Sequence, residues 1–218
     1  MRILVTAGPT REPIDPVRFI GNRSSGKMGY ALAAAARRRG HTTALISGPV
    51  SLPAPEGVDL ERIGTAAEML EAVRRRLPAS DALIMAAAVA DWRPAAVSPV
   101  KLKKGAAPPL LPLEATVDIL KAVATQKGLR VFVGFAAETG EAVAEARRKL
   151  REKNLDLIVA NDVSQPDAGF EVDTNRAVLI PAEGAPEALP LMSKADLADR
   201  IVAWIEAFTS PSRPGSSC

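Results

Sequence analysis

The sequence predicts an α/β protein with a Rossmann-like, doubly wound and mostly parallel sheet, which has helices on both faces and an irregular arm. Short, almost wholly apolar runs alternate with segments of helical periodicity, as expected for strands that helices bury on both faces. Loops rich in small, polar or acidic residues follow these runs. A chain of 218 residues, 47% of them hydrophobic, can also bury one substantial core.

The apolar runs predict strands at residues 3–6, 43–47, 82–87, 131–135, 155–160 and 177–180. The helical patterns predict helices at residues 25–39, 65–77, 118–124, 141–153 and 194–208. Ser193 is the expected N-cap of the last helix, whose apolar residues recur with a helical period. We therefore expect a single domain over residues 1–208, followed by a disordered Pro/Ser/Gly-rich tail at 209–218.

One long segment breaks the alternation, at about residues 93–117. It carries Lys101, Lys103 and Lys104 among several prolines and has no helical period, so it predicts an arm or flap with a short strand near 110–113. Its lysines could neutralise charge on a phosphate, or they could belong to a solvated basic loop. The residue pattern alone leaves both interpretations open.

The composition excludes several kinds of chemistry. The only cysteine is Cys218 and the only histidine is His41, so a disulfide within the chain, a cysteine metal cluster and a His-based catalytic triad are not expected. A net charge of +3 with 4% aromatic residues does not suggest nucleic-acid binding by base stacking. The sequence begins with a strand rather than a signal peptide, and we expect a cytoplasmic protein.

The motif GNRSSGKMG at residues 21–29 lies before an Ala-rich helix. Glycines and small residues let main-chain N–H groups approach a phosphate, and the helix dipole favours an anion there. The spacing nearly matches a Walker A loop, but Met28 stands where a magnesium-binding hydroxyl should be. The alternative is a helix start capped by Ser24 or Ser25 that binds nothing.

Other candidate residues also have two interpretations. Lys149 and Lys153 share one helix face and could hold an anion, but spacing alone favours a solvent-facing, charge-rich surface. Asp91 follows a predicted strand, a usual place for a carboxylate near magnesium. Asp118 could serve a ligand or only cap a helix. Because ligands bind at the carboxyl ends of the strands in open α/β sheets, the polar loops together favour a site at that edge.

The segments TAGPTREPIDPVRFIGNRSSGKMGYALA, AAAVADWRP, KLKK, GFAAET and KNLDLIVANDVS occur in this order. They resemble the phosphopantothenate–cysteine ligases (phosphopantothenoylcysteine synthetases), the second half of the bifunctional coenzyme A biosynthesis protein. The resemblance runs from residue 3 to about residue 208. It implies CTP-dependent ligation of 4'-phosphopantothenate to L-cysteine through an acyl-cytidylate, which releases pyrophosphate and then CMP, with Mg²⁺ as the cofactor.

The resemblance also implies roles for individual residues. Asn22 would act on the acyl-cytidylate, and Lys101, the first lysine of KLKK, would promote its formation. Lys101 is also expected to bind the nucleotide. The further expected nucleotide-binding residues are Ser24, Ser25, Gly26, Asp91, Val117, Asp118, Ile119, Leu120, Phe135, Lys149 and Lys153. On this basis Lys149 and Lys153 contact the nucleotide, against the interpretation from spacing alone. No metal ligands are assigned.

The expected partners are the three substrates, a second copy of the chain in a homodimer, and a decarboxylase half, fused or separate. The flavin-binding decarboxylase half is not in this sequence, which fits either a separate ligase or one domain of a longer chain. The alternative function is a nucleotide-binding sensor or an oxidoreductase of similar fold. An oxidoreductase predicts a Tyr-x-x-x-Lys pair, whereas Tyr30 is followed four residues later by Ala34.

Overall fold

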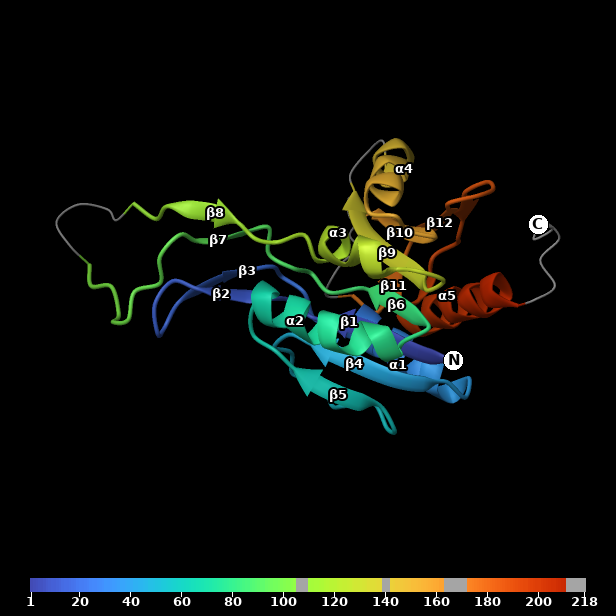
Figure 1. The fold of residues 1–218 in the computed structure, drawn as a ribbon, viewed down its shortest axis with the longest axis horizontal. Helices are drawn as coiled ribbons and strands as arrows, with labels where there is room; N and C mark the ends of the chain where they lie inside the picture. Colours follow the sequence, from blue (N-terminus) through green and yellow to red (C-terminus); the bar gives the residue numbers. More distant parts are fainter. Residues whose placement is uncertain (105–109, 139–141, 163–171, 211–218) are drawn as a thin grey trace.

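The fold was analysed in a computed structural model that describes residues 1–104, 110–138, 142–162 and 172–210. Eight strands form one sheet in the order β13-β12-β10-β9-β6-β1-β4-β5 (Figure 1). They are β1 (Arg2–Ala7), β4 (Thr42–Ser47), β5 (Asp59–Arg62), β6 (Ala82–Met85), β9 (Val131–Glu138), β10 (Leu157–Asp162), β12 (Ala177–Pro181) and β13 (Glu187–Ala188). The strands β10, β9, β6, β1, β4 and β5 pair in parallel. Strand β12 pairs antiparallel with β10, and β13 pairs antiparallel with β12.

Helices cover both faces of the sheet. They are α1 (Lys27–Arg38), α2 (Ala66–Arg76), α3 (Ile119–Val123), α4 (Ala142–Glu152) and α5 (Lys194–Thr209). Side chains alternate between the two faces along each strand, so Ile3 and Val5 pack with α1 and α5, whereas Leu4 packs with α2 and α3. The predicted doubly wound fold is confirmed, with the reversal of strand order between β1 and β6.

Each predicted strand of the sheet and each predicted helix exists, with shifted ends. The strand expected at 82–87 ends at Met85, because Ala87 N donates to the Thr6 hydroxyl instead of to a neighbouring strand. The strand expected from 155 begins at Leu157, since Leu155 N closes the end of α4 by donating to Leu150 O. The first residue of the helix expected at 141–153 lies outside the described residues, as does the predicted tail from 211 onwards.

Several short strands were not predicted. The edge strand β5 has the sequence DLER, with no apolar run to mark it. The pairs β2 (Arg11–Pro13) with β3 (Phe19–Gly21), and β11 (Thr174–Asn175) with β14 (Met192–Ser193), are too short for a period of two to show. Single 3₁₀ turns at Leu77–Ala79 and Ala124–Gln126 extend α2 and α3.

Helix α1 begins two residues later than predicted because of Gly26. This residue is the N-cap and has a φ of 77°, a left-handed conformation that glycine adopts without strain. A Cβ at Gly29 would lie 2.4 Å from the Ala7 Cβ, so a glycine there lets α1 lie close to the end of β1. The two glycines together place the start of α1 at the carboxyl end of the central strand.

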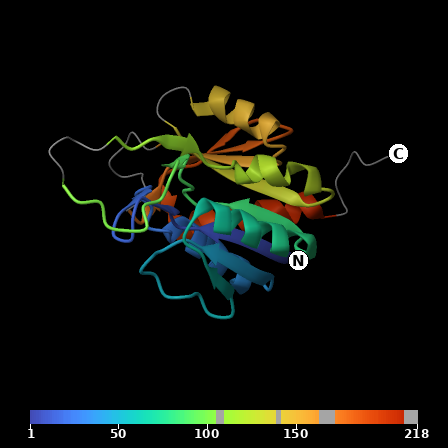
Figure 2. The ribbon, with the colours of Figure 1, turned by 60° about the vertical axis from the view of Figure 1, so that its left-hand side comes forward.

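The predicted arm is a two-stranded ribbon and a long loop that project from the body of the molecule (Figures 1 and 2). Strand β7 (Trp92–Pro94) pairs with β8 (Leu113–Ala115). The short strand expected at 110–113 is thus displaced toward the chain end, since Pro112 has no N–H and only its carbonyl pairs, with Ala95 N. Residues 105–109 of the arm lie outside the described residues.

Ser193 and His41 both make contacts at helix α5. Ser193 caps α5 as predicted, accepting a hydrogen bond from Asp196 N. His41 is buried beside the first residue of β4, and its Nε2 lies 2.8 Å from Glu206 Oε1 on α5. Among the described residues, no helix is long and apolar enough to cross a membrane.

Candidate functional site

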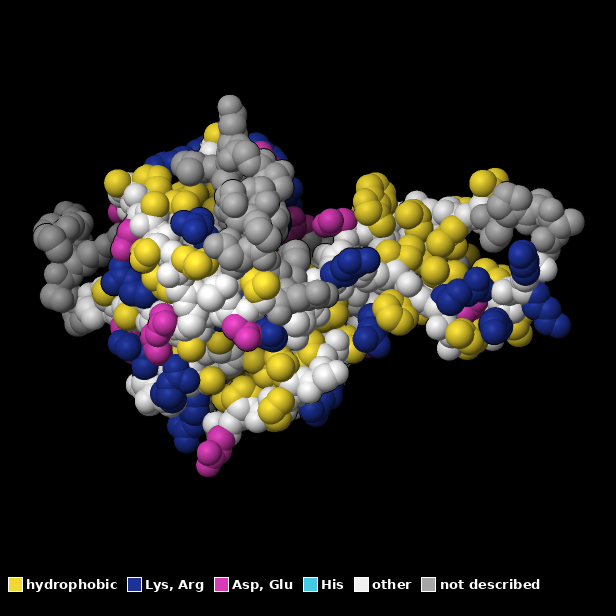
Figure 3. All heavy atoms as spheres, turned by 180° about the vertical axis from the view of Figure 1, so that it is seen from behind, with side chains coloured by type: hydrophobic (Ala, Val, Ile, Leu, Met, Phe, Trp, Pro, Cys, Tyr) yellow, Lys and Arg dark blue, Asp and Glu magenta, His cyan; other side chains and the backbone are white. Residues whose placement is uncertain are grey.

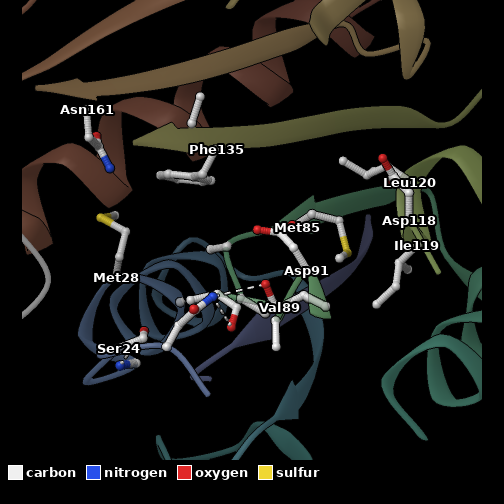
Figure 4. Close-up of a pocket in the computed structure, with 18 of the residues that line it drawn as sticks. Ser24, Met28, Met85, Val89, Asp91, Asp118, Ile119, Leu120, Phe135 and Asn161 are labelled. Carbon is white, nitrogen blue, oxygen red and sulfur yellow. Dashed lines mark hydrogen bonds between the residues drawn. The ribbon is translucent and has the colours of Figure 1, made fainter. Parts of the chain in front are cut away.

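A cavity of about 400 Å³ lies at the carboxyl ends of β6, β9 and β10, beside the start of α1 (Figure 4). It is therefore at the edge and near the strand-order reversal where open α/β sheets bind ligands. Every predicted site residue except Lys101 lines it: Asn22, Ser24, Ser25, Gly26, Asp91, Val117, Asp118, Ile119, Leu120, Phe135, Lys149 and Lys153. The structure thus brings together residues spread over most of the chain.

The loop before α1 forms one wall of this cavity. Asn22 Nδ2 donates hydrogen bonds to the carbonyls of Ala88 at 3.3 Å and Val89 at 3.0 Å, which join this loop to the segment after β6. Ser24 Oγ accepts from Gly26 N at 3.4 Å. Neither serine is the N-cap of α1, because Gly26 holds that position, and among the described residues no side chain makes the cap hydrogen bond. The positive end of the α1 dipole therefore faces the cavity without a capping side chain.

The start of α3 forms the opposite wall (Figure 4). Asp118 is the N-cap of this helix, accepting from Lys121 N, as one of its two interpretations predicts. It also lies at the cavity, where its carboxylate pairs with Lys153 Nζ at 3.1 Å. The Lys149 and Lys153 side chains are 31% and 27% exposed and line the cavity. The two lysines thus face a cavity and not only solvent, and their contact with a nucleotide stays a prediction.

The middle of the cavity has one acidic and one aromatic residue. Asp91 lies in the segment after β6, with its side chain exposed, and Phe135 projects from β9 (Figure 4). Mg²⁺ bound with a nucleotide usually takes one or two carboxylates, substrate phosphates and water. Asp91 and Asp118 are the acidic residues that line this cavity. The carboxylate of Asp118 is already paired with Lys153, so Asp91 is the carboxylate that fits this donor set. Among the described residues, no three His, Cys, Asp or Glu side chains cluster as a metal cage.

A second cavity, of about 380 Å³, lies on the other side of the same loop. It is lined by Pro9, Arg11, Phe19, Gly21, Asn22, Arg23, Ser24, Ser25 and Pro49. Arg11 lies with its guanidinium carbon 4.5 Å from the centre of the Phe19 ring, a cation–π contact that holds this cation in place. The two cavities share Asn22, Ser24 and Ser25, so the loop before α1 stands between two spaces, both with cationic side chains.

Lys101 is the predicted site residue that the structure does not bring to the site. It is exposed on the arm and lines neither cavity. Its neighbour Leu102 is held, because Leu102 N donates to Asp15 Oδ2 at 3.1 Å and Leu102 O accepts from Arg18 Nη2 at 2.8 Å. The Arg18 guanidinium beside Asp15 holds the pKa of that buried carboxyl well below its usual range. Lys101 therefore has a fixed neighbour but no contact with either cavity.

Sequence reasoning missed further residues that line the first cavity. They are Met85 at the end of β6, residues 86–90 after it, Thr116, Ala136, Asn161 at the end of β10, Asn175 on β11 and Lys194 at the start of α5. Lys27, Met28 and Gly29, which belong to the motif identified at residues 21–29, line the cavity as well. The place of some of these residues in the sequence could have marked them as candidates, since Asn161 follows a predicted apolar strand and Lys194 follows a predicted helix cap. Neither signal distinguishes a binding residue from a solvated loop.

Comparisons with known proteins identify relatives over most of the chain. Residues 1–208 match the family described as the DNA/pantothenate metabolism flavoprotein C-terminal domain. The coenzyme A biosynthesis bifunctional protein CoaBC of Bacillus subtilis is 50% identical over 95% of this chain and 51% of its own length. The protein of the same name from Escherichia coli is 50% identical over 89% of this chain and 48% of its own length. The chain thus spans about half the length of these curated relatives.

A solved structure shows the same fold. It is the crystal structure of the C-terminal domain of a coenzyme A biosynthesis bifunctional protein CoaBC, with a TM-score of 0.82 and 42% sequence identity. The match covers 95% of this chain and 94% of the other. The likeness therefore extends over the whole sheet and its helices.

Proposed function

The chain belongs to the DNA/pantothenate metabolism flavoprotein C-terminal domain family, and from this membership we propose that it is a cytoplasmic phosphopantothenate–cysteine ligase of coenzyme A biosynthesis. The observation that carries the proposal is the pair of cavities that share Asn22, Ser24 and Ser25. A ligase that activates one substrate with another needs two adjoining binding spaces. A nucleotide sensor needs only one.

In the proposed reaction, the carboxylate of 4'-phosphopantothenate attacks the α-phosphorus of CTP and displaces pyrophosphate. The product is an acyl-cytidylate. The amino group of L-cysteine then attacks its acyl carbon, loses a proton and expels CMP. Because the substrate carboxylate is the nucleophile of the first step, no nucleophilic side chain is needed. The protein contributes by positioning the reactants and stabilising charge.

The first cavity suits the nucleotide. The uncapped start of α1 offers a phosphate site, and Lys149 and Lys153 add positive charge. We assign the cytosine base to the opposite wall, where residues 117–120 line the cavity around the start of α3. Asp91 is the carboxylate that would hold Mg²⁺, which would neutralise phosphate charge there.

The second cavity suits the acid substrate, which carries a phosphate and a carboxylate. Arg11 and Arg23 line it and provide cations for these anionic groups. Asn22 stands at the junction, where an activated carboxyl group must face both the nucleotide and the cysteine. We propose that Asn22 orients the acyl-cytidylate there for attack by the amine.

The proposal is tested by pyrophosphate release from the purified chain with 4'-phosphopantothenate and magnesium. CTP is compared with ATP, each with and without L-cysteine. We expect steady release only with CTP and cysteine together, because cysteine must remove the acyl group before another turnover. No release with either nucleotide would contradict the ligase and favour a binding module. Steady release with ATP and not CTP would contradict the nucleotide assignment alone.

The arm supports a further part of the proposal, a homodimer. Exposed apolar side chains gather along it (Figure 3). Those in the arm and at its base are Val17, Phe19, Trp92, Val97, Val100, Leu102, Leu110, Leu111 and Leu113. Exposed apolar patches of this extent mark interaction surfaces. We propose that a second copy of the chain covers them, and that the decarboxylase half of the bifunctional relatives acts with this chain, fused or separate.

Leu113→Glu is expected to shift the chain from dimer to monomer. Leu113 on β8 is 47% exposed, and burying a carboxylate under a partner chain costs several kcal/mol without a cation to pair it. Light scattering coupled to size exclusion measures the mass. Leu129→Glu is the matched control, because Leu129 is fully exposed outside the arm. A monomeric parent chain, or equal dissociation by both variants, would contradict the arm interface.

A further inference from the structure

Thr10 is a fully buried residue in the loop between β1 and β2, and it lines neither cavity. Its hydroxyl accepts a hydrogen bond from Ala90 N at 3.0 Å, and its main-chain N–H donates to Ala88 O at 3.3 Å. Ala88 N donates in turn to Gly8 O at 2.9 Å. The loop between β1 and β2 therefore holds the segment after β6 by three hydrogen bonds, two of which involve Thr10.

The segment that Thr10 holds depends on side-chain partners for its main chain. Residues 86–90 follow the end of β6 and lie outside the regular strands of the sheet. Ala90 is 3% exposed, its N–H donates to the Thr10 hydroxyl, and its carbonyl accepts from the Thr116 hydroxyl. A buried main-chain N–H group that loses its acceptor is costly, so the segment would shift to find another one. The Thr10 hydroxyl thus fixes where this segment lies.

The same segment holds Asn22, to which we assign a role in the second step of the reaction. Asn22 Nδ2 donates to Ala88 O at 3.3 Å and to Val89 O at 3.0 Å (Figure 4, dashed lines). Ala88 O therefore accepts from both Thr10 N and Asn22 Nδ2. Val89 lies between the two residues to which Thr10 bonds. The place of the Asn22 amide follows from two carbonyls whose own place depends on Thr10.

Thr10 also lies close to the main chain directly before Asn22. A Cβ at Gly21, the last residue of β3, would lie only 2.7 Å from Thr10 O. The chain that carries Asn22 thus passes against Thr10, and the acceptors of its side chain are held by Thr10. A displacement at Thr10 would reach Asn22 by both routes.

We infer that Thr10 is a positioning residue of the active site, whose hydroxyl holds residues 88–90 where their carbonyls orient Asn22. The inference rests on the proposed function, because Asn22 has a catalytic role only if the chain is a ligase. Thr10 lines neither cavity, so it acts through Asn22. Loss of its hydroxyl should slow the attack of cysteine on the acyl-cytidylate and spare the formation of that intermediate.

Thr10→Val tests the hydroxyl, because valine keeps the shape of the side chain but offers Ala90 N no acceptor. We expect the release of about one pyrophosphate per site to persist, and cysteine-dependent turnover to be about ten- to a hundredfold slower, as for a catalytic group displaced by about 1 Å. Rapid-quench assays measure both steps, and calorimetry measures CTP affinity, which should stay within about threefold. Residues 86–90 also line the first cavity. An equal loss of CTP affinity and of both steps would therefore overturn the inference, as would turnover at the parent rate.

Two further variants separate the hydroxyl from the packing around it. Thr10→Ser keeps the hydroxyl and loses only the methyl group. Thr43→Val makes the same change as Thr10→Val at a buried threonine of β4, whose hydroxyl donates to His41 O and which lines neither cavity. We expect both variants to turn over within about threefold of the parent rate. If Thr10→Ser is slowed as much as Thr10→Val, the packing of Thr10 matters and not its hydroxyl, and the inference fails.

A double variant shows whether Thr10 acts through Asn22. Two residues that serve one interaction give losses that do not add. Asn22→Asp combined with Thr10→Val should therefore turn over no more slowly than Asn22→Asp alone. If the second substitution slows the first variant by another factor of about ten or more, Thr10 acts on a different group and the inference is wrong.

The position of Asn22 is also measured without the reaction, by nitrogen–proton correlation NMR of the parent chain and its variants. The side-chain amide signal of Asn22 is the one that is missing from Asn22→Asp. We expect Thr10→Val to shift this signal, and Thr10→Ser and Thr43→Val to leave it in place. An unshifted signal in Thr10→Val would overturn the inference. If the signal shifts as expected but the parent chain forms no product, then the proposed reaction fails while the positioning of Asn22 by Thr10 stands.

Discussion

Lys101→Ala is expected to reduce both pyrophosphate release and product formation by about a thousandfold or more, while CTP affinity stays within about twofold. Lys101 is exposed on the arm and lines neither cavity, so it adds nothing to nucleotide binding in this conformation. Its proposed role begins when the arm brings its ammonium group to the charge that develops on the phosphate. A group that acts only in the transition state lowers kcat and leaves ground-state binding intact.

Steady-state assays of pyrophosphate, together with CTP titration by calorimetry, measure the two effects separately. Lys103→Ala is the matched control, since Lys103 is an exposed lysine two residues further along the same arm. We expect that variant to retain most of its activity. Equal losses in both variants would mean that only the net charge of the arm matters. Full activity of Lys101→Ala would remove Lys101 from the mechanism.

Asn22→Asp is expected to release about one pyrophosphate per site and then to turn over about a hundred- to a thousandfold more slowly with L-cysteine. Asn22 Nδ2 donates to the carbonyls of Ala88 and Val89, and a carboxylate cannot donate to either. The substituted side chain leaves its position between the two cavities and no longer orients the acyl-cytidylate. Formation of this intermediate depends on other groups and continues once.

Rapid-quench measurement of pyrophosphate and CMP in a single turnover distinguishes the two steps. Ser25→Ala changes a neighbouring residue of the same loop without removing these hydrogen bonds, and we expect its two steps to slow together if at all. A variant Asn22→Asp that ligates cysteine at the parent rate would show that the role is wrongly assigned. A variant with no pyrophosphate burst would move Asn22 to the first step.

The sheet and its helices could be predicted because their residues carry a local pattern. Leu4, Ile46 and Phe132 belong to apolar runs that are buried on both faces of the sheet. The edge strand β5 could not be predicted, because its residues are only partly buried and mostly charged. The strand of the arm was displaced because its pairing depends on Pro112 and Ala95, which are far apart in sequence.

The site could be predicted only where a residue type is informative by itself. The glycines and serines before α1 indicate a phosphate loop, and the structure places this loop at a cavity. Spacing alone did not predict that Lys149 and Lys153 line a cavity, since Asp118, the partner of Lys153, comes from another helix. Asn161 is one polar residue among many after strands, and only its hydrogen bond with Asn175 sets it apart.

The pairing of Asp15 with Arg18 has a consequence for how the arm could be exchanged between proteins. The two residues lie between β2 and β3, and β3 ends directly before Asn22. They hold both main-chain groups of Leu102, next to Lys101. Hydrogen bonds therefore link the β2–β3 pair to the arm, although the two come from separate stretches of the chain. An arm grafted from a relative would need its own residues 11–21 with it. If the arm alone were grafted, the chimaera would lose the relative placement of its two proposed catalytic residues, Asn22 and Lys101.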